Sequence, residues 1–234
     1  MEITTLASSS KGNAYIVTDG AFPLLIEAGI PWKQIRQKLN FQTSSIAGCL
    51  ISHSHADHSK SWQGVAKAGI DIYTSQGTID ALGMTGHRIK PIEPLCQFQI
   101  GNWKILPFPT EHDCEGSMGF LLANQVGEKL LFITDSFYSK YCFSGITHLM
   151  IETNHSYEIL TQNVEAGLIP QAQKNRLIQS HFSLENVKKF LLANDLSKVK
   201  SIHLLHLSEG NSDAEQFKRE VQELTGKSVI VAGE

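Results

Sequence analysis

The sequence lacks the cysteine pairs that would mark a disulfide framework or a thiolate zinc site. Its four cysteines, Cys49, Cys96, Cys114 and Cys142, are scattered, and no two of them form a CxxC pair. Disulfide-rich secreted domains and zinc fingers carry closely spaced cysteines instead. We therefore expect four reduced, partly buried thiols in structural or surface positions.

Long hydrophobic runs are also missing. No segment approaches the roughly 18 uninterrupted apolar residues that a membrane-spanning helix needs. Residues 1–5, MEITT, lack the basic n-region and the apolar h-region of a secretory signal. These features predict a cytoplasmic protein that does not act at a membrane.

No strong excess of one charge is present. Lys and Arg total 20 against 23 Asp and Glu, which gives a net charge of −3. The whole molecule therefore has no positive field to attract nucleic acid, and any such binding must be local. The sequence has no internal repeat, low-complexity stretch or Pro/Gly/Ser-rich linker, so we expect one domain over residues 1–234.

Short β-like runs dominate the first two thirds of the chain and return near its end. They cover residues 2–6, 14–18, 23–27, 48–52, 70–74, 103–108, 118–123, 129–134, 200–205 and 228–232. Turn sequences at residues 8–13 and 19–20 predict tight connections between antiparallel neighbours. We therefore expect the N-terminal part to form a β-meander.

Helical periodicity is present between some of these runs. Residues 31–39 and 75–84 have the spacing of helices with one buried face. Ser183 predicts the N-cap of a third helix, and Ser212 with Glu215 predicts the capping box of a fourth. Strands early and helices between strands late indicate an α/β protein whose sheets are covered by helices.

The most informative segment is His53-Ser54-His55-Ala56-Asp57-His58. In an extended backbone His53, His55 and Asp57 point the same way, and His58 points to the other side. Imidazoles and a carboxylate bind zinc, iron or manganese, and two neighbouring sets of them suit a dinuclear centre. Chance clustering is the alternative, but the frequencies of His and Asp in this chain make it a rare event.

Three further donors follow β-like runs: His112, Asp135 and His206. Donors at strand ends converge on one rim of a sheet, where α/β proteins build their sites. Taken singly, His112 could be an ordinary loop histidine and Asp135 a turn or helix-cap residue. His203 competes with His206, but its alternation with Leu205 is typical of a core strand position.

With these residues the chain resembles the metallo-β-lactamase-fold hydrolases, whose pattern is HxHxDH followed by a distant His, an Asp and a last His. Segments 8–13, 152–155, 180–183 and 205–208 are similar to the YycJ/WalJ-like branch of that family. One departure is Glu27-Ala28-Gly29, where the family often carries Asp-x-Gly. The resemblance covers almost the whole chain and implies an α/β fold, the αββα four-layer sandwich of the metallo-β-lactamase type.

The resemblance also implies two divalent metal ions, with zinc expected first and manganese or iron as alternatives. By the family pattern the first metal is held by His53, His55 and His112, the second by Asp57, His58 and His206, and Asp135 bridges them. A hydroxide bridging the metals would be the nucleophile. Asp57 would orient it or hold its proton, while His155 and His181 would contact substrate oxygens or protonate the leaving group. As bare sequence, these last two histidines fit a surface loop or a helix cap equally well.

The leading hypothesis is a phosphodiesterase or nuclease acting on DNA as an exonuclease, because the branch is associated with that activity. A hydrolase of small thioesters, lactones or lactams on the same metal centre is the alternative. A third possibility is a regulatory protein that keeps the metal without turnover. Cleavage of a small ester with indifference to DNA would select the second hypothesis, and metal-loaded protein inert to every substrate class the third.

Residues 171–200 carry six basic and two acidic side chains, a local excess of +4 in a chain of −3. Such a stretch suits a nucleic-acid backbone, although a solvated helix face is the simpler interpretation. Phe182 and Phe190 are the only aromatic residues in it, so base stacking is not indicated. The sequence leaves open the metal, the cleavage polarity and the oligomeric state.

Overall fold

The computed structural model describes residues 1–233, which group into two compact units. The first unit comprises Met1–Pro109, Cys114–Glu128 and Gly233, and the second comprises Thr110–Asp113 and Lys129–Ala232. Within the described part of the chain, none of the helices combines the length and the apolar character that crossing a membrane would require.

A six-stranded sheet organises the first unit. Its strands, in spatial order, are β1 (Glu2–Ala7), β2 (Ala14–Thr18), β3 (Leu24–Ile26), β4 (Gly48–Leu50), β5 (Ile72–Thr74) and β6 (Ile89–Pro91). The pairs β1–β2 and β2–β3 are antiparallel, as the turn sequences predict, but the strands from β3 to β6 are parallel. The predicted meander is therefore wrong beyond β3.

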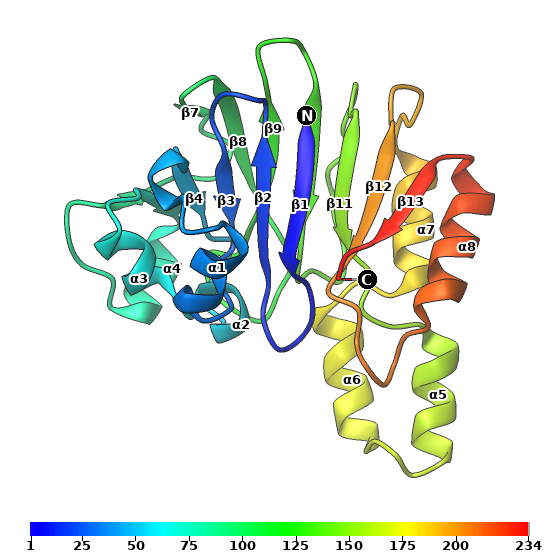
Figure 1. Ribbon diagram of the computed structural model, residues 1–234. Helices are drawn as coiled ribbons and strands as arrows, with labels where there is room; N and C mark the ends of the chain where they lie inside the picture. The colour runs from blue at the N-terminus through cyan, green and yellow to red at the C-terminus, as the bar shows by residue number, and fades with distance from the viewer. Residues whose placement is uncertain (234) are drawn as a thin grey trace. The chain divides into compact units, whose positions relative to one another are not determined.

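Helices explain the change to parallel strands, because a parallel pair needs a crossover connection and helices usually supply it. They are α1 (Trp32–Lys38), α2 (Ala56–Ser59), α3 (Trp62–Lys67) and α4 (Gln76–Leu82), with a 3₁₀ turn at Thr43–Ser45. They lie together next to β3 and β4 (Figure 1). Ile35 of α1 and Val65 of α3 belong to one buried cluster with Leu25 and Ile72 of the sheet.

A second, antiparallel set of strands completes the first unit: β7 (Phe98–Ile100), β8 (Trp103–Pro109) and β9 (Met118–Ala123). It packs on the first sheet through aromatic side chains. Phe98 stacks on Tyr73 with ring centroids 5.3 Å apart, and the Trp103 indole nitrogen donates to the carbonyl of Phe22 at 2.7 Å. These two contacts join the antiparallel strands to the rest of the first unit.

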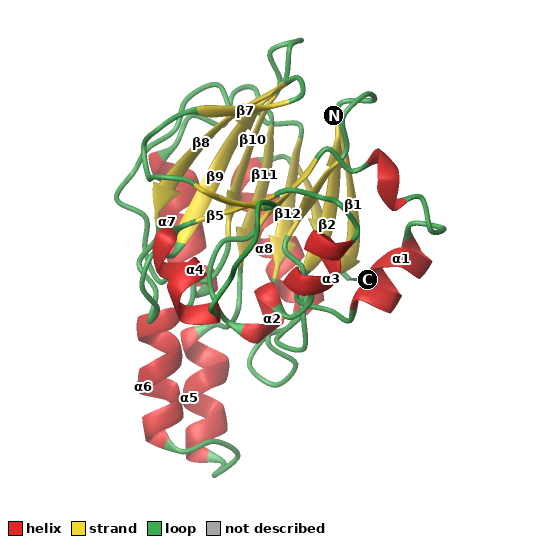
Figure 2. Cartoon of the chain, turned by 90° about the vertical axis from the view of Figure 1, so that its left-hand side faces the viewer, coloured by secondary structure: helices red, strands yellow, loops and turns green. Residues whose placement is uncertain are grey.

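The second unit contains a parallel sheet with the strand order β10 (Lys129–Ile133), β11 (His148–Glu152), β12 (Ser201–Leu205) and β13 (Ser228–Val231). Its helices are α5 (Tyr157–Glu165), α6 (Gln171–Ser180), α7 (Leu184–Ala193) and α8 (Ala214–Thr225). Both ribbon views show α5 and α6 side by side as a hairpin (Figures 1 and 2). The sequence pattern predicts neither this hairpin nor β11.

The N-caps of α7 and α8 can be compared with the caps predicted from the sequence. Ser183 accepts a hydrogen bond from the backbone of Asn186 at the start of α7, which confirms the predicted cap. At α8 the cap is Asp213, while Ser212 donates to the carbonyl of Ser208 instead. The predicted capping box is therefore displaced by one residue, because Asp and Ser are equally good N-caps and the backbone decides between them.

Candidate metal centre

The HxHxDH segment follows β4 in the first unit. His53 lies in the irregular segment after β4, His55 is the N-cap of α2, and Asp57 and His58 lie in that short helix. The ring of His53 is 4.8 Å from that of His55 and 4.2 Å from that of His58, measured between centroids. Although the rings are neighbours, the potential ligand atoms of His53 and His55 belong to one group and those of Asp57 and His58 to another. The side-chain period changes from two to 3.6 where the helix begins, which brings Asp57 into the group of His58.

The backbone segments around Asn13 and Gly29 contact α2. The backbone nitrogen of Asn13 donates to the carbonyl of Asp57 at 2.8 Å, and its side-chain nitrogen lies 3.2 Å from Nε2 of His58. A Cβ added to Gly29 would lie 1.6 Å from the carbonyl oxygen of Asp57, so only glycine allows this approach. The turn at residues 8–13 therefore supports the ligand loop.

Glu27 is buried beside the same loop. Its carboxylate accepts the backbone N–H of Ser52 at 3.2 Å and lies 3.6 Å from Nδ1 of His58. Burial raises the pKa of Glu27, although the neighbouring His58 and the hydrogen bonds from Ser52 oppose that shift. A carboxyl group thus occupies a supporting position at the loop, in the segment where this chain departs from the family's usual Asp.

Cys114 is the residue of the first unit that the sequence interpretation missed. Its sulfur, together with one nitrogen each of His53 and His55, belongs to a group of potential ligand atoms within 4.8 Å of one another. The expected role as an ordinary structural thiol is therefore incomplete. No CxxC spacing marks this cysteine, and it becomes a candidate only through the fold.

In the second unit, three donor residues stand at the carboxyl ends of neighbouring parallel strands. Asp135 follows β10, Glu152 ends β11, and His206 follows β12. Asp135 and His206 have φ values of 40° and 54°, a left-handed conformation that non-glycine residues rarely adopt. The chain turns sharply at these strand ends and presents both side chains at the same edge of the sheet.

The carboxylate of Asp135 is surrounded by three imidazoles. Its oxygens lie 3.7 Å from Nε2 of His112, 3.7 Å from Nδ1 of His181 and 3.9 Å from Nε2 of His206. Two ligands that each bind a tetrahedral metal at about 2.0–2.2 Å are roughly 3.4 Å apart. The spacings of Nε2 of His112 and Nε2 of His206 from Asp135, and the donor types, therefore fit a divalent metal ion.

A hydrogen bond from outside this group fixes how the imidazole of His112 is oriented. His112 lies with Nδ1 2.8 Å from the carbonyl of Ser180, so Nδ1 donates and Nε2 faces Asp135. Burial lowers the pKa of His112, although Asp135 and Glu152 oppose this. The neutral imidazole is the form that binds metals.

Glu152 is a second residue that the sequence interpretation left without a role. This fully buried carboxylate accepts the backbone N–H groups of Ser136 at 3.0 Å and Phe182 at 3.2 Å, and it lies 2.5 Å from Nδ1 of His181. One side chain thereby ties together the end of β11, the turn after Asp135 and the segment before α7. Such carboxylate–histidine contacts orient ligands in metal sites.

The two predicted catalytic histidines have different positions. His181 belongs to a group of potential ligand atoms with Asp135, Glu152 and His206, whereas His155 belongs to none of the groups found among the described residues. His155 is fully buried, and burial lowers its pKa to about 4. Its imidazole is therefore neutral at pH 7.

The basic residues of segment 171–200 do not act as one surface. The amine of Lys188 pairs with Glu220 of α8 at 2.9 Å, and that of Lys174 donates to the hydroxyl of Thr161 in α5 at 2.7 Å. Lys189, the neighbour of Lys188, is exposed on another side of α7. The Lys188–Glu220 ion pair therefore offsets one of the positive charges that the sequence counts.

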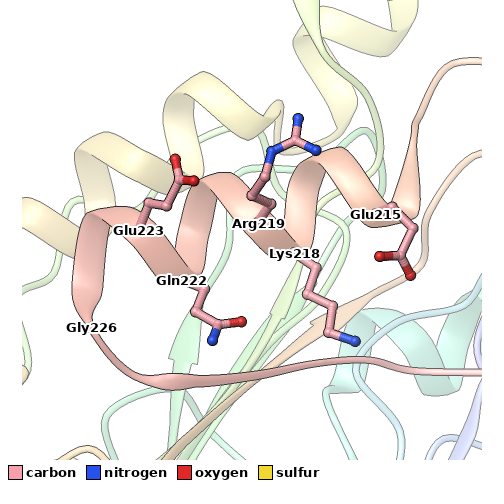
Figure 3. Close-up of a pocket in the computed structure, with 6 residues that line it drawn as sticks. All are labelled: Glu215, Lys218, Arg219, Gln222, Glu223 and Gly226. Atoms are coloured by element: carbon pink, nitrogen blue, oxygen red, sulfur yellow. The ribbon is translucent and has the colours of Figure 1, made fainter.

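A wide depression on α8 has no comparable chemistry. Glu215, Lys218, Arg219, Gln222, Glu223 and Gly226 line it, and their charges cancel. Figure 3 shows the charged ends pointing in different directions around the helix. Without convergent polar groups, this surface is not a candidate active site.

Comparison with known proteins agrees with the donor pattern. A family model described as the metallo-beta-lactamase superfamily matches residues 10–145, more than half of the chain. The chain is 26% identical over 250 residues to exodeoxyribonuclease YycJ of Bacillus anthracis, covering 100% of this chain and 92% of that protein. It is 27% identical over 222 residues to exodeoxyribonuclease WalJ of Streptococcus pneumoniae, covering 88% and 81%.

Solved structures give the same fold. The metallo-beta-lactamase fold protein YhfI from Bacillus subtilis superposes with a TM-score of 0.73 at 14% identity, covering 98% of this chain and 95% of that one. The short form of human tRNase Z superposes with a TM-score of 0.68 at 16% identity, covering 99% and 96%. The predicted fold class is confirmed, and the chain belongs to the metallo-β-lactamase superfamily.

Proposed function

We propose that this metallo-β-lactamase-fold hydrolase is a metal-dependent phosphodiesterase that degrades DNA from its ends. The observation that carries the proposal is the Asp135 carboxylate with Nε2 of His112 at 3.7 Å and Nε2 of His206 at 3.9 Å. The substrate class is supported by two relatives that are named exodeoxyribonucleases and align over most of this chain.

The ligand assignment is part of the proposal and rests on the order of donors along the chain. It gives the first metal to His53, His55 and His112, the second to Asp57, His58 and His206, and the bridge to Asp135. Zinc is the first expectation, and manganese and iron suit the same donors. Cys114, which lies near His53 and His55, is a further donor that soft metals would favour.

Divalent ions in such a site would supply a nucleophile from water at neutral pH and stabilise the charge that develops on a phosphoryl group. The side chains of this protein would position the other participants. Glu152 would accept from Nδ1 of His181, so Nε2 would accept a proton in the neutral imidazole and would donate to a substrate oxygen once the ring is protonated. Asp57, partly exposed in α2, would orient the attacking water or hold its proton.

The experiment that tests this function is cleavage of end-labelled single- and double-stranded DNA and RNA by the purified protein with added zinc or manganese. The Asp57→Ala variant provides the control, because it lacks one proposed ligand and keeps the fold's other donors. We expect metal-dependent shortening of DNA from one end and none with the variant. The ladder of products separates trimming from internal cutting.

Two results would contradict the proposal. The first is that DNA and RNA strands stay intact although the protein has bound metal, which would exclude these nucleic acids as substrates; hydrolysis of a thioester or lactone by the same preparation would then assign the centre to small molecules. The second is cleavage of RNA without cleavage of DNA, which would keep the phosphodiesterase activity but replace DNA by RNA as the substrate.

A further inference from the structure

A small pocket of the second unit lies between the segment that follows Asp135 and the helix α7. Its volume is about 220 Å³, and its walls include Tyr138, Lys140, Tyr141, Phe182, Lys189 and Phe190. Small-molecule sites usually measure about 300–1,000 Å³. The pocket therefore suits one flat ring better than a large ligand.

Hydrogen bonds hold this pocket in shape. The side-chain nitrogen of Asn186 in α7 donates to the carbonyl of Phe137 at 3.2 Å, and the side-chain oxygen of Asn194 accepts the backbone N–H of Phe143 at 2.6 Å. The segment is thus fastened to both ends of α7. A pocket formed before the ligand arrives costs less ordering entropy on binding.

At two places in the sequence, residues that line the pocket stand close to residues of the candidate metal centre. Tyr138 is three residues from Asp135, and the Ser136 hydroxyl between them donates to the Tyr138 carbonyl at 2.7 Å. Phe182, a wall of the pocket, follows His181, and its backbone N–H donates to Glu152, the carboxylate that holds His181. The residues that would contact a ligand in the pocket are therefore within a few residues of the centre in the sequence.

The walls combine aromatic rings with positive charge. Tyr138 is 55% exposed, and the amine of Lys140 lies 5.5 Å above the Tyr141 ring. No acidic side chain is among the residues that line the pocket, although Lys140 pairs from its edge with the exposed Glu111 at 3.6 Å. Aromatic faces stack on nucleobases, and lysines attract the phosphates that accompany them.

We propose that this pocket binds a nucleobase of the DNA strand, with Tyr138 and Tyr141 against its face and Lys189 at the adjoining phosphate. The inference rests on the proposed function and adds a binding site for the strand outside the metal centre. The sequence of α7 alone does not indicate base stacking, because the two tyrosines come from another segment. The fold brings them to Lys189.

The test measures binding of a fluorescent oligothymidylate whose phosphorothioate linkages resist hydrolysis. Fluorescence anisotropy with the full, metal-loaded chain gives the affinity at several salt concentrations. We expect Tyr138→Ala to weaken binding about 10-fold, because stacking is worth about 1–3 kcal/mol per base. Tyr138→Phe should restore it. Lys189→Ala should weaken binding. It should also make the slope of the logarithm of the binding constant against the logarithm of the salt concentration shallower, by the amount expected for the loss of about one phosphate contact.

A scan of abasic positions along the strand identifies the base that the pocket holds. Removing that base should weaken binding to the wild type and have no further effect on Tyr138→Ala. Phe41→Ala, on an exposed ring in the first unit, and Lys218→Ala, on α8, serve as matched controls that should bind normally.

The outcomes separate this inference from the proposed function. If the wild type binds and cleaves the strand but Tyr138→Ala and Lys189→Ala bind as tightly, the pocket assignment is wrong and the nuclease remains. An abasic scan without any sensitive position has the same meaning. If the wild type neither binds nor cleaves DNA, the function itself is wrong and the pocket assignment fails with it.

Discussion

At the scale of single residues, three of the six non-glycine residues with positive φ in the described part of the chain are candidate ligands or, in the case of Glu27, support the ligand loop. Glu27, Asp135 and His206 have φ values of 64°, 40° and 54°. Each such conformation costs a non-glycine residue of the order of 1–3 kcal/mol, and strain of this kind clusters at functional sites. The three residues end or follow strands, where the backbone must turn at once to present a side chain. Glycine would relieve the strain but would remove the carboxyl or imidazole group.

Glu152 offers a residue-scale prediction, because one buried carboxylate holds two backbone N–H groups and His181. Glu152→Gln keeps the shape but leaves an amide N–H₂ against at least one of these donors. We expect about 10–100-fold lower metal affinity or DNA cleavage, the usual cost of losing a partner of the ligand shell. Metal titration and cleavage kinetics measure the two effects.

The matched control is Glu158→Gln, the same substitution at an exposed position of α5. It should change neither quantity. Equal behaviour of the two variants would show that Glu152 has no part in the centre.

His203 carries a prediction about pH and stability. Burial, together with neighbouring His148, lowers the pKa of His203 to about 4 in the folded protein. The unfolded chain, with a pKa near 6.5, binds more protons between these values, so the free energy of unfolding falls as the pH decreases through 6.5 toward 4. Between pH 7 and pH 5 we expect the free energy of unfolding to fall by about 2 kcal/mol less in His203→Gln than in the wild type.

Urea unfolding at both pH values measures this difference. His87→Gln removes an exposed histidine and should show the same pH dependence as the wild type. If His203→Gln retains the full wild-type loss, the buried imidazole does not carry that pH dependence.

Individual site residues could be predicted where their spacing in the sequence is itself typical of metal ligands. His53, His55, Asp57 and His58 stand in one short motif and are neighbours in the fold. Cys114 has no local pattern, and Glu152 looks like any acidic residue at a strand end. Their importance comes from the atoms that tertiary structure places around them, which a single sequence does not show.

At the scale of elements, the close approach of two backbones determines the position of α2. A Cβ on Gly29 would overlap the carbonyl of Asp57 and come within 2.8 Å of the His58 nitrogen. We expect Gly29→Ala to displace the ligand loop, lowering the free energy of unfolding by about 1–3 kcal/mol, as overpacking does, and reducing metal binding. Urea unfolding and metal titration measure both.

Gly210→Ala is the control for this substitution, because an added Cβ there meets nothing within 4 Å. It should leave the free energy of unfolding and the metal content close to those of the wild type. Normal metal binding by Gly29→Ala would mean that the loop tolerates displacement and that its support is not needed.

The elements themselves divide into those with local signals and those without. The turns after β1 and β2 and the Ser183 cap of α7 have specific residue preferences and are confirmed. The parallel direction of β4 to β6 depends on crossover connections, and β11 is a continuous buried run that fits a helix or a strand. Tertiary packing decides these cases.

At the scale of the whole molecule, the ligand assignment proposed above draws on donors from both compact units. Metal that binds only the folded chain stabilises it by about 2.7 kcal/mol at 100 times its dissociation constant. One kcal/mol shifts Tm by about 2–4 °C in a chain of this size. We therefore expect a chelator to lower Tm by roughly 5–10 °C.

Ligand variants from each unit test whether the donors act together. Asp57→Ala removes a donor of the first unit and His206→Ala one of the second, so a shared centre requires both variants to lose metal and to show a smaller shift of Tm with chelator. Calorimetry with and without chelator, together with the metal content per chain, measures this. A full chelator shift in Asp57→Ala would mean that the second unit binds its metal alone, through Asp135, Glu152, His181 and His206, whose donor atoms lie within 4.8 Å of one another. The HxHxDH segment would then have to serve a separate site, and the bridging role of Asp135 would be wrong.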